Sequence, residues 1–198
     1  MQQLTKPVPI KAYLGEIMEA ILYLLRFAFD ALLIILIMRV WLQWVKADFY
    51  NPLSQFIVKV SNPLVVPLRR VIPGFGGIDL ATIVAAYIVA SLKFFVLTAL
   101  AGEALGALAF YIGLLVLLKQ AGFLLFIIMI IMAVMSWVVQ GYNPTLAIFH
   151  QLTEPFLNPI RRIIPSMGGL DLSMIVAFLA LNVINILLSN SLPYWSAL

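Results

Sequence analysis

The sequence PLRRVIP, at residues 67–73, recurs as PIRRIIP at residues 159–165, and this repetition decides how the chain is organised. A second motif follows each copy at the same interval, GGIDL at residues 76–80 and GGLDL at residues 168–172. Chance does not place such matches in one register, and self-similarity at a fixed period is the mark of a repeated structural unit.

The repetition also extends upstream of the arginine pairs. An Asn-Pro dipeptide precedes each pair by the same interval, at residues 51–52 and 143–144. We therefore predict a tandem duplication, with a first unit at residues 1–102 and a second at residues 103–198.

The composition indicates a membrane protein. Of the 198 residues, 64% are hydrophobic and only 10% are charged, and the mean hydropathy is +1.11. Soluble domains have roughly 25% charged residues, so most of this surface must face lipid. The net charge of +4 is scattered between apolar runs and forms no basic face, so we expect no direct contact with nucleic acid.

Four stretches are long enough to span a bilayer, which requires about 20 apolar residues. They are residues 17–45, 80–101, 104–139 and 172–191, and the loops between the members of each pair contain interfacial segments at residues 51–73 and 143–165. The predicted fold is an all-α membrane protein built from two units of spanning helix, interfacial helix and spanning helix. Residues 104–118 could be re-entrant, interfacial or part of one long helix.

Two spans in each unit put both Arg-Arg loops on one side of the membrane. Those loops carry most of the basic residues outside the spans, and the positive-inside rule then places them in the cytoplasm. We expect a multi-pass membrane protein with both termini on the opposite side; in a bacterium these locations are the cytoplasmic (inner) membrane and the periplasm.

The arginine pairs follow amphipathic segments. Leu53, Phe56, Ile57 and Val60 fall on one helical stripe, which predicts a helix lying in the interface and broken at Pro63. The arginines would contact lipid phosphates, or form a headgroup site or a docking patch for a cytoplasmic partner. The candidate lipid- or partner-binding residues are Arg69, Arg70, Arg161, Arg162 and Lys59.

Asp79 and Asp171 each follow a Gly-Gly pair and precede a spanning helix. An aspartate there can cap the free N–H groups of the first turn. It could also form a salt bridge that holds the Arg-Arg segment against the bundle, or contribute to a cation site.

Five charges lie in or beside the spans, and each needs a partner, water or an interface. They are Arg26, Asp30, Arg39, Lys93 and Lys119. We expect Arg26 and Asp30, four residues apart, to pair on one helix face, and Arg39 and Lys93 to snorkel towards the nearest interface. In the last span, Asn182 and Asn185 could hydrogen-bond another helix.

The sequence contains no arrangement of residues typical of catalysis. It has no cysteine, which excludes disulfides and thiolate metal sites, and its single histidine has no partner cluster. No nucleophile elbow, zinc-protease motif or phosphate loop occurs. We therefore expect neither an enzyme nor a cofactor or metal site.

Taken together, these motifs resemble the YggT (YlmG-like) family of small bacterial and plastid membrane proteins. The resemblance covers nearly the whole chain: RVWLQW at residues 39–44, Asn-Pro, PLRRVIP and GGIDL, then MSW at residues 135–137, Asn-Pro, EPFLNPIRRIIP at residues 154–165 and GGLDL. One departure is that the second copy has Met132 where the first has Arg39.

The resemblance implies links with osmotic tolerance and cation uptake in bacteria, and with assembly of membrane cytochrome complexes and nucleoid distribution in plastids. One hypothesis is therefore a transport-related or accessory subunit in ion or osmolyte homeostasis. The other is a non-catalytic assembly or scaffold factor that binds lipids or a cytoplasmic partner through its Arg-Arg loops. Either would involve membrane lipids and a homo-oligomer or a membrane-protein partner.

Overall fold

The secondary structure is all-helical in this computed structural model, which describes residues 10–103, 106–138, 141, 143–164 and 171–198. The helices are α1 (Ile10–Trp44), α2 (Pro52–Arg69), α3 (Leu80–Leu100), α4 (Leu108–Val138), α5 (Pro144–Ile163), α6 (Ser173–Ser191) and the short 3-10 helix η1 (Trp195–Ala197). A spanning helix, an amphipathic helix and a second spanning helix thus occur twice in order. The predicted all-α tandem duplication is confirmed.

Four helices are long and apolar enough to cross a membrane, namely Tyr13–Trp44 of α1, α3, Leu108–Met135 of α4, and α6. α4 is one continuous helix of 31 residues, so residues 108–118 are its first three turns and not a separate re-entrant piece. At 1.5 Å per residue such a helix is about 46 Å long, which exceeds the hydrocarbon thickness of about 30 Å. Residues 104–105 lie outside the described part.

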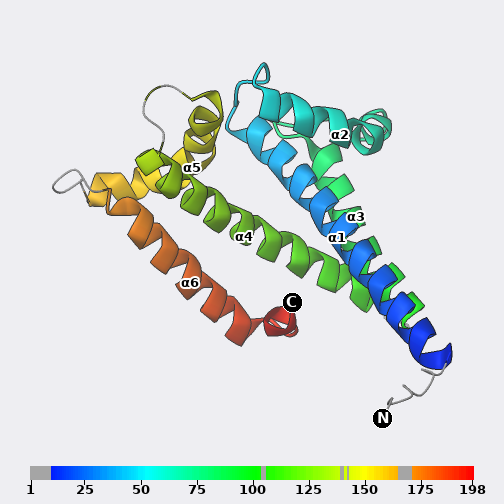
Figure 1. The fold of residues 1–198 in the computed structure, drawn as a ribbon. Coiled ribbons are helices and arrows are strands. Elements are labelled where there is room, and N and C mark those ends of the chain that lie inside the picture. Colours follow the sequence, from blue (N-terminus) through cyan, green and yellow to red (C-terminus); the bar gives the residue numbers. More distant parts are fainter. Residues whose placement is uncertain (1–9, 104–105, 139–140, 142, 165–170) are drawn as a thin grey trace, which may run out of the picture.

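The spanning helices are packed unevenly. α1 runs along α3, and α3 runs along α4, whereas α6 has only a small contact with α4. Figure 1 shows α2 and α5 at the same end of the molecule, with α6 at its edge. Both Arg-Arg segments therefore lie at one end of the helix bundle, as parallel repeats require.

The two repeats join through a close contact between α3 and α4. Gly113 faces Ser91 so tightly that a Cβ atom at position 113 would lie 2.3 Å from the Ser91 Oγ and 2.8 Å from its Cα. Only glycine allows the two backbones to approach this closely, a common device in membrane helix pairs.

Each Asn-Pro dipeptide starts an amphipathic helix. The Asn51 Oδ1 accepts from the Leu53 N–H at 2.9 Å, and the Asn143 Oδ1 accepts from the Thr145 N–H at 2.9 Å. A proline follows each cap at the first helical position, where its missing N–H costs nothing. This capping role fixes where α2 and α5 begin.

The predicted break at Pro63 is wrong, because α2 continues through Pro63 and Pro67 to Arg69. Side-chain donors supplement the backbone ladder in the preceding turn. The Ser61 hydroxyl donates to the carbonyl of Ile57 at 2.5 Å and to that of Val58 at 3.2 Å. The carbonyl that loses its N–H partner at Pro63 is that of Lys59, so these bonds strengthen the turn before the proline and do not replace the missing hydrogen bond.

α5 behaves like α2 at the corresponding prolines. It runs through Pro155 and Pro159 without a break. The Thr153 hydroxyl, which occupies the position of Ser61, donates to the carbonyls of Phe149 at 2.9 Å and His150 at 3.2 Å. The same device therefore operates in both repeats.

Candidate functional site

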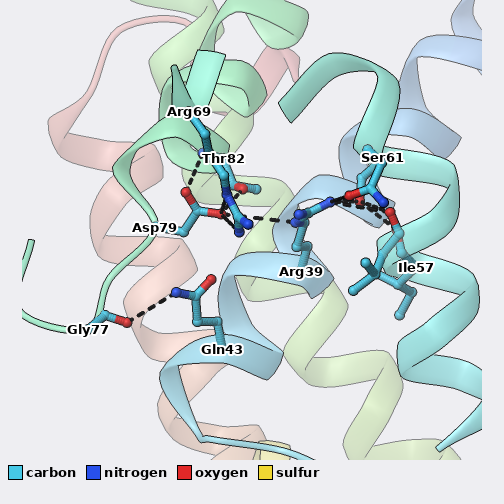
Figure 2. A network of polar contacts seen from close by, with 10 residues as sticks. Arg39, Gln43, Ile57, Ser61, Arg69, Gly77, Asp79 and Thr82 are labelled. Atoms are coloured by element: carbon cyan, nitrogen blue, oxygen red, sulfur yellow. Dashed lines mark hydrogen bonds and ion pairs between the residues drawn. The ribbon is translucent and has the colours of Figure 1, made fainter. Parts of the chain in front are cut away.

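The most concentrated polar cluster lies where α2 returns to the bundle at the start of α3 (Figure 2). Asp79, 4% exposed, accepts from the Arg69 guanidinium, with the Nε at 3.1 Å from its Oδ2. The same carboxylate accepts from the Thr82 N–H at 3.3 Å and caps α3. Asp79 thus forms both the helix cap and the salt bridge that the sequence left as alternatives.

The chain reaches Asp79 through a tight turn. Phe75 and Ile78 exchange backbone hydrogen bonds of 3.1 and 3.0 Å. Between them, Gly76 and Gly77 have positive φ angles of 61° and 83°, a conformation that glycine adopts without strain. The Gly-Gly pair therefore brings Asp79 back to the end of α2.

Arg39 is buried within the same cluster, at 4% exposure, and the expectation that it snorkels is wrong. Its Nη1 donates to the Ser61 Oγ at 2.6 Å and to the Asn62 Oδ1 at 3.0 Å. Its Nε lies 4.0 Å from the Asp79 Oδ2. Figure 2 shows Arg39 between Asp79 on one side and Ser61 on the other. This arginine joins α1 to both α2 and α3.

The surroundings of Asp79 favour its charged form. Burial alone would raise the pKa of this carboxyl, but hydrogen bonds from Arg69 and Thr82 and the Arg69 charge hold the pKa below its ordinary value. The carboxylate is therefore ionised at neutral pH and serves as a fixed anion between two guanidiniums.

The second repeat builds a related but more exposed cluster. The Arg161 Nε and Nη2 lie 3.0 and 2.7 Å from the Asp171 Oδ2, and its Nη1 lies 3.0 Å from the Glu154 Oε2. Side-chain exposure is 32% for Arg161, 33% for Asp171 and 48% for Glu154. Glu154 occupies the position of Asn62, and Met132 occupies that of Arg39. The second cluster therefore has one more carboxylate than the first and lacks the buried arginine.

The pKa values in this second cluster follow from the same contacts. Burial would lower the pKa of Arg161, but hydrogen bonds and charge from Asp171 and Glu154 raise it. Burial would likewise raise the pKa of Asp171, yet hydrogen bonds from Ser173 and Arg161 lower it. Unlike Asp79, Asp171 precedes the N-cap residue Leu172 and accepts from the Ser173 N–H at 3.0 Å.

The two arginines of each pair have different environments. Arg69 and Arg161 bind the aspartate ten residues further along, whereas Arg70 and Arg162 are exposed. Within the described part of the chain, the side chains of these second arginines form no hydrogen bond or ion pair. The same holds for Lys59 on the exposed side of α2. The members of each pair therefore differ in their ion pairing more than in their exposure, because the side chain of Arg69 is itself 45% exposed.

The packed face of α2 differs from the predicted stripe. Ser54, Ile57, Ser61 and Val65 are the residues that face the bundle. Phe56, 57% exposed, and Val60 lie outside this contact. The helix therefore has one face against the protein and an apolar flank free of it, a division that the stripe alone did not reveal.

The charges deeper in the spans pair between helices. The Lys93 Nζ lies 2.6 Å from the Asp30 Oδ1, so the predictions that Asp30 pairs with Arg26 and that Lys93 snorkels are both wrong. The packing of α1 against α3 brings Lys93 close to Asp30. Asp30 therefore pairs across the helix interface, and not with Arg26 on its own helix. Arg26 is exposed, with no ion pair among the described residues.

Lys119 binds the C-terminal turn. Its Nζ donates to the Trp195 carbonyl at 2.9 Å and lies 5.8 Å from the centre of that indole ring. The Trp195 Nε1 in turn donates to the Asn185 Oδ1 at 2.9 Å. Lys119 therefore links α4 to η1 and, through Trp195, to α6.

Sequence reasoning missed the hydrogen-bonding partners of Arg39. Ser61 and Asn62 lie more than twenty positions from it, on another helix. The duplication carried no signal for these partners, because Thr153 keeps a hydroxyl at the position of Ser61 although Met132 stands in the place of Arg39. In the part of the chain that the structure describes, no group of three His, Asp or Glu side chains could hold a metal ion.

The fold and these clusters define a class: a multi-span helical membrane protein with two parallel repeats, each fastening an amphipathic helix by an Arg–Asp pair. The model of the CCB3/YggT family matches the chain twice, at residues 18–100 and 111–192. The chain belongs to the CCB3/YggT family.

Curated relatives agree with this assignment. A Vibrio alginolyticus protein described as lying in the proC 3′ region is 48% identical over 90% of this chain and 98% of its own length. The Escherichia coli K12 protein named YggT is 44% identical over 85% of this chain and 88% of its own. The Pseudomonas aeruginosa protein PA0392 is 43% identical over 87% and 90%. No solved structure matches the chain.

Proposed function

We propose that the protein is a non-catalytic assembly or scaffold factor of the bacterial cytoplasmic membrane. It holds two amphipathic helices at the cytoplasmic surface and presents their outward basic side chains to a partner membrane protein. The observation that carries this proposal is the division of each arginine pair, in which the first arginine is ion-paired internally and the second is exposed.

The internal ion pairs support a fixed presentation. Arg69 and Arg161 bind carboxylates at the starts of α3 and α6, so the ends of α2 and α5 are attached to spanning helices. Because the backbone of each segment is already restrained, it loses little further freedom when a partner binds, and only the exposed arginine side chains have to be ordered. A planar guanidinium suits a carboxylate or a phosphate on that partner.

The placement of the two segments supports a single docking side. α2 and α5 lie at the same end of the molecule (Figure 1). That end contains Lys59, Arg70 and Arg162, and basic residues next to spans favour the cytoplasm. The exposed apolar side chains Phe56 and Val60 suit a helix lying in the interface.

The test compares the two kinds of arginine by site-specific crosslinking in cells. Replacing the exposed pair, Arg70→Gln with Arg162→Gln, should lower the yield of crosslinked partner by about tenfold or more. Membrane insertion and the unfolding temperature should stay unchanged. The matched variant, Arg69→Gln with Arg161→Gln, removes the same charge but should lower the unfolding temperature. Capture of lipid and self-contacts alone would contradict the scaffold proposal.

A second candidate is a transport-related or accessory subunit in ion or osmolyte homeostasis. The Asp30–Lys93 pair favours it, because Lys93 lies inside α3, about 20 Å from the end near α2 and about 10 Å from the other end, and a charge inside a span is costly. Each charge is neutralised by the other, which is why scaffolding is the better supported function.

Ion flux into liposomes would separate the two candidates. A transport role predicts that Asp30→Asn or Lys93→Met abolishes flux of the purified protein, with Arg26→Gln as the control at an unpaired charge. Purified protein with no flux under any imposed gradient would contradict transport by this chain.

A further inference from the structure

The last spanning helix is the least covered part of the bundle. Of the most apolar window in α6, 11% of residues are buried, compared with 44% for α3, its counterpart in the first repeat. α3 packs along α1, whereas α6 makes only a small contact with α4. Figure 1 shows α6 at the edge of the molecule, so one side of it is free of the rest of the chain.

The free side of α6 has a regular pattern. Ile175, Leu179, Asn182 and Ile186 are all exposed, and the three apolar members are 57%, 62% and 55% exposed. Val183, Ile184 and Leu187 are exposed as well, so exposure alone does not single out these four. What distinguishes them is that their spacing of four, three and four residues is the 3.5-residue period of a helix–helix seam and that the stripe includes an amide near mid-span. Ser173 and Ala177, which are buried against the bundle, lie on the other side of the helix. We refer to these four exposed residues as the α6 seam.

Asn182 distinguishes the α6 seam from a surface made for lipid. It is the tenth of the 19 residues of α6, and therefore lies about 14 Å from either end, near the middle of a span. Its side chain forms no hydrogen bond in the described chain. Lipid tails offer neither donor nor acceptor, so an unpaired amide at this depth costs roughly 2–7 kcal/mol.

The neighbouring amide shows the opposite case. The Asn185 Oδ1, one turn further along α6, accepts from the Trp195 Nε1 at 2.9 Å. Asn185 therefore has a partner within its own chain. Asn182 needs one from outside it.

We propose that α6 is the contact helix of a parallel homodimer, in which the Asn182 side chains of two copies hydrogen-bond each other across the α6 seam. Two copies insert with the same orientation, so a two-fold axis along the membrane normal places each residue opposite itself. A carboxamide both donates and accepts, and it can therefore pair with its own copy. One asparagine in an apolar seam also fixes the register. This inference is independent of the proposed scaffold function.

Single-cysteine crosslinking in native membranes tests the dimer directly, because the chain has no cysteine of its own. Leu179→Cys and Ile186→Cys should each give a disulfide-linked product of twice the 22.0 kDa chain mass. Ile184→Cys is the matched control, since residue 184 is 50% exposed but lies about 160° round the helix from residue 186. Equal or absent crosslinking at all three positions, or adducts with other proteins only, would overturn the proposal.

The role of the amide is tested in the Leu179→Cys background. Asn182→Leu should weaken dimerisation about three- to thirtyfold, the range for a hydrogen bond between membrane helices. Asn182→Gln, which keeps an amide, should retain the crosslink. Asn185→Leu, which removes an amide already bound by Trp195, should also leave it unchanged. A crosslink that is insensitive to Asn182→Leu would overturn the pairing.

Discussion

The two repeats fasten the same kind of helix with opposite charge balances. In the first repeat, Asp79 forms ion pairs with two guanidiniums, those of Arg39 and Arg69. In the second repeat, Arg161 serves two carboxylates, those of Glu154 and Asp171. The duplicated chain has thus kept the Arg–Asp pair and exchanged the third member of each cluster.

The exchange also changes how deeply the cluster is buried. In the first cluster Arg39 and Asp79 have side-chain exposures of 4% and 3%, and Arg69 alone is exposed, at 45%. In the second cluster all three charged side chains are 32–48% exposed. Met132, in the place of Arg39, receives only a weak contact of 3.3 Å from the Thr153 hydroxyl to its sulfur. The first repeat therefore has a buried electrostatic attachment, and the second has an exposed one. We expect the repeats to differ in stability accordingly.

The largest expected effect is the removal of the shared carboxylate. Asp79→Asn leaves buried Arg39 and its neighbour Arg69 without an anion, and breaking a buried pair costs about 3–5 kcal/mol. Asp171→Asn, in the exposed cluster, should cost about 1 kcal/mol or less. Unfolding of the purified protein in mixed micelles measures both. Equal losses of unfolding free energy in the two variants would contradict the expectation that the buried carboxylate contributes more.

A smaller effect is expected at the hydroxyls that stabilise the proline-containing helices. Ser61→Ala removes an acceptor of the charged Arg39 side chain, and hydrogen bonds to charged groups contribute about 1.5–3 kcal/mol. Thr153→Ala removes a contact to an uncharged sulfur and should cost less than about 1 kcal/mol. The same unfolding measurement shows which of the two variants loses more free energy of unfolding. A larger loss of stability for Thr153→Ala than for Ser61→Ala would contradict the expected order.

The smallest effect is the dependence of stability on pH. The folded-state pKa values of Asp79 and Asp171 lie below the ordinary value of about 3.9. The stabilisation that these two ionised carboxylates contribute to the folded state is therefore present above about pH 4. It is lost as the pH falls through their lowered pKa values. Unfolding temperatures recorded from pH 7 down to pH 3 should decline more steeply at the acid end for the natural protein than for Asp171→Asn. Identical curves would show that Asp171 contributes nothing there.

Much of the fold was predictable because hydropathy and repetition report on the bilayer directly. The predicted span at residues 80–101 corresponds to Leu80–Leu100, and that at residues 172–191 corresponds to Ser173–Ser191. Residues 51–73 and 143–165 contain α2 and α5, whose observed ends are Arg69 and Ile163; residue 165 lies outside the described part. The predicted break at Pro63 failed because proline propensity does not report tertiary packing: Ser61 and Val65, on either side of Pro63, are both buried against the bundle.

The polar partners were less predictable, because they depend on how helices meet. Hydropathy indicates that Asp30 needs a counter-charge, but not that Lys93, 63 positions away, supplies it. A salt bridge from the Arg-Arg segment to Asp79 was one of three alternatives at this aspartate, beside helix capping and a cation site. Helix capping needed no distant partner, so nothing in the sequence favoured the pairing with Arg69 that the structure shows.

The comparison of the repeats is tested most directly by giving the first repeat the residues of the second. Arg39→Met alone should destabilise the protein by about 1.5–3 kcal/mol, because three hydrogen bonds of a charged group are lost. Adding Asn62→Glu should restore part of that stability, since a carboxylate at position 62 would reach Arg69 as Glu154 reaches Arg161. A cost below about 0.5 kcal/mol for the first change, or a further loss on adding the second, would contradict the account.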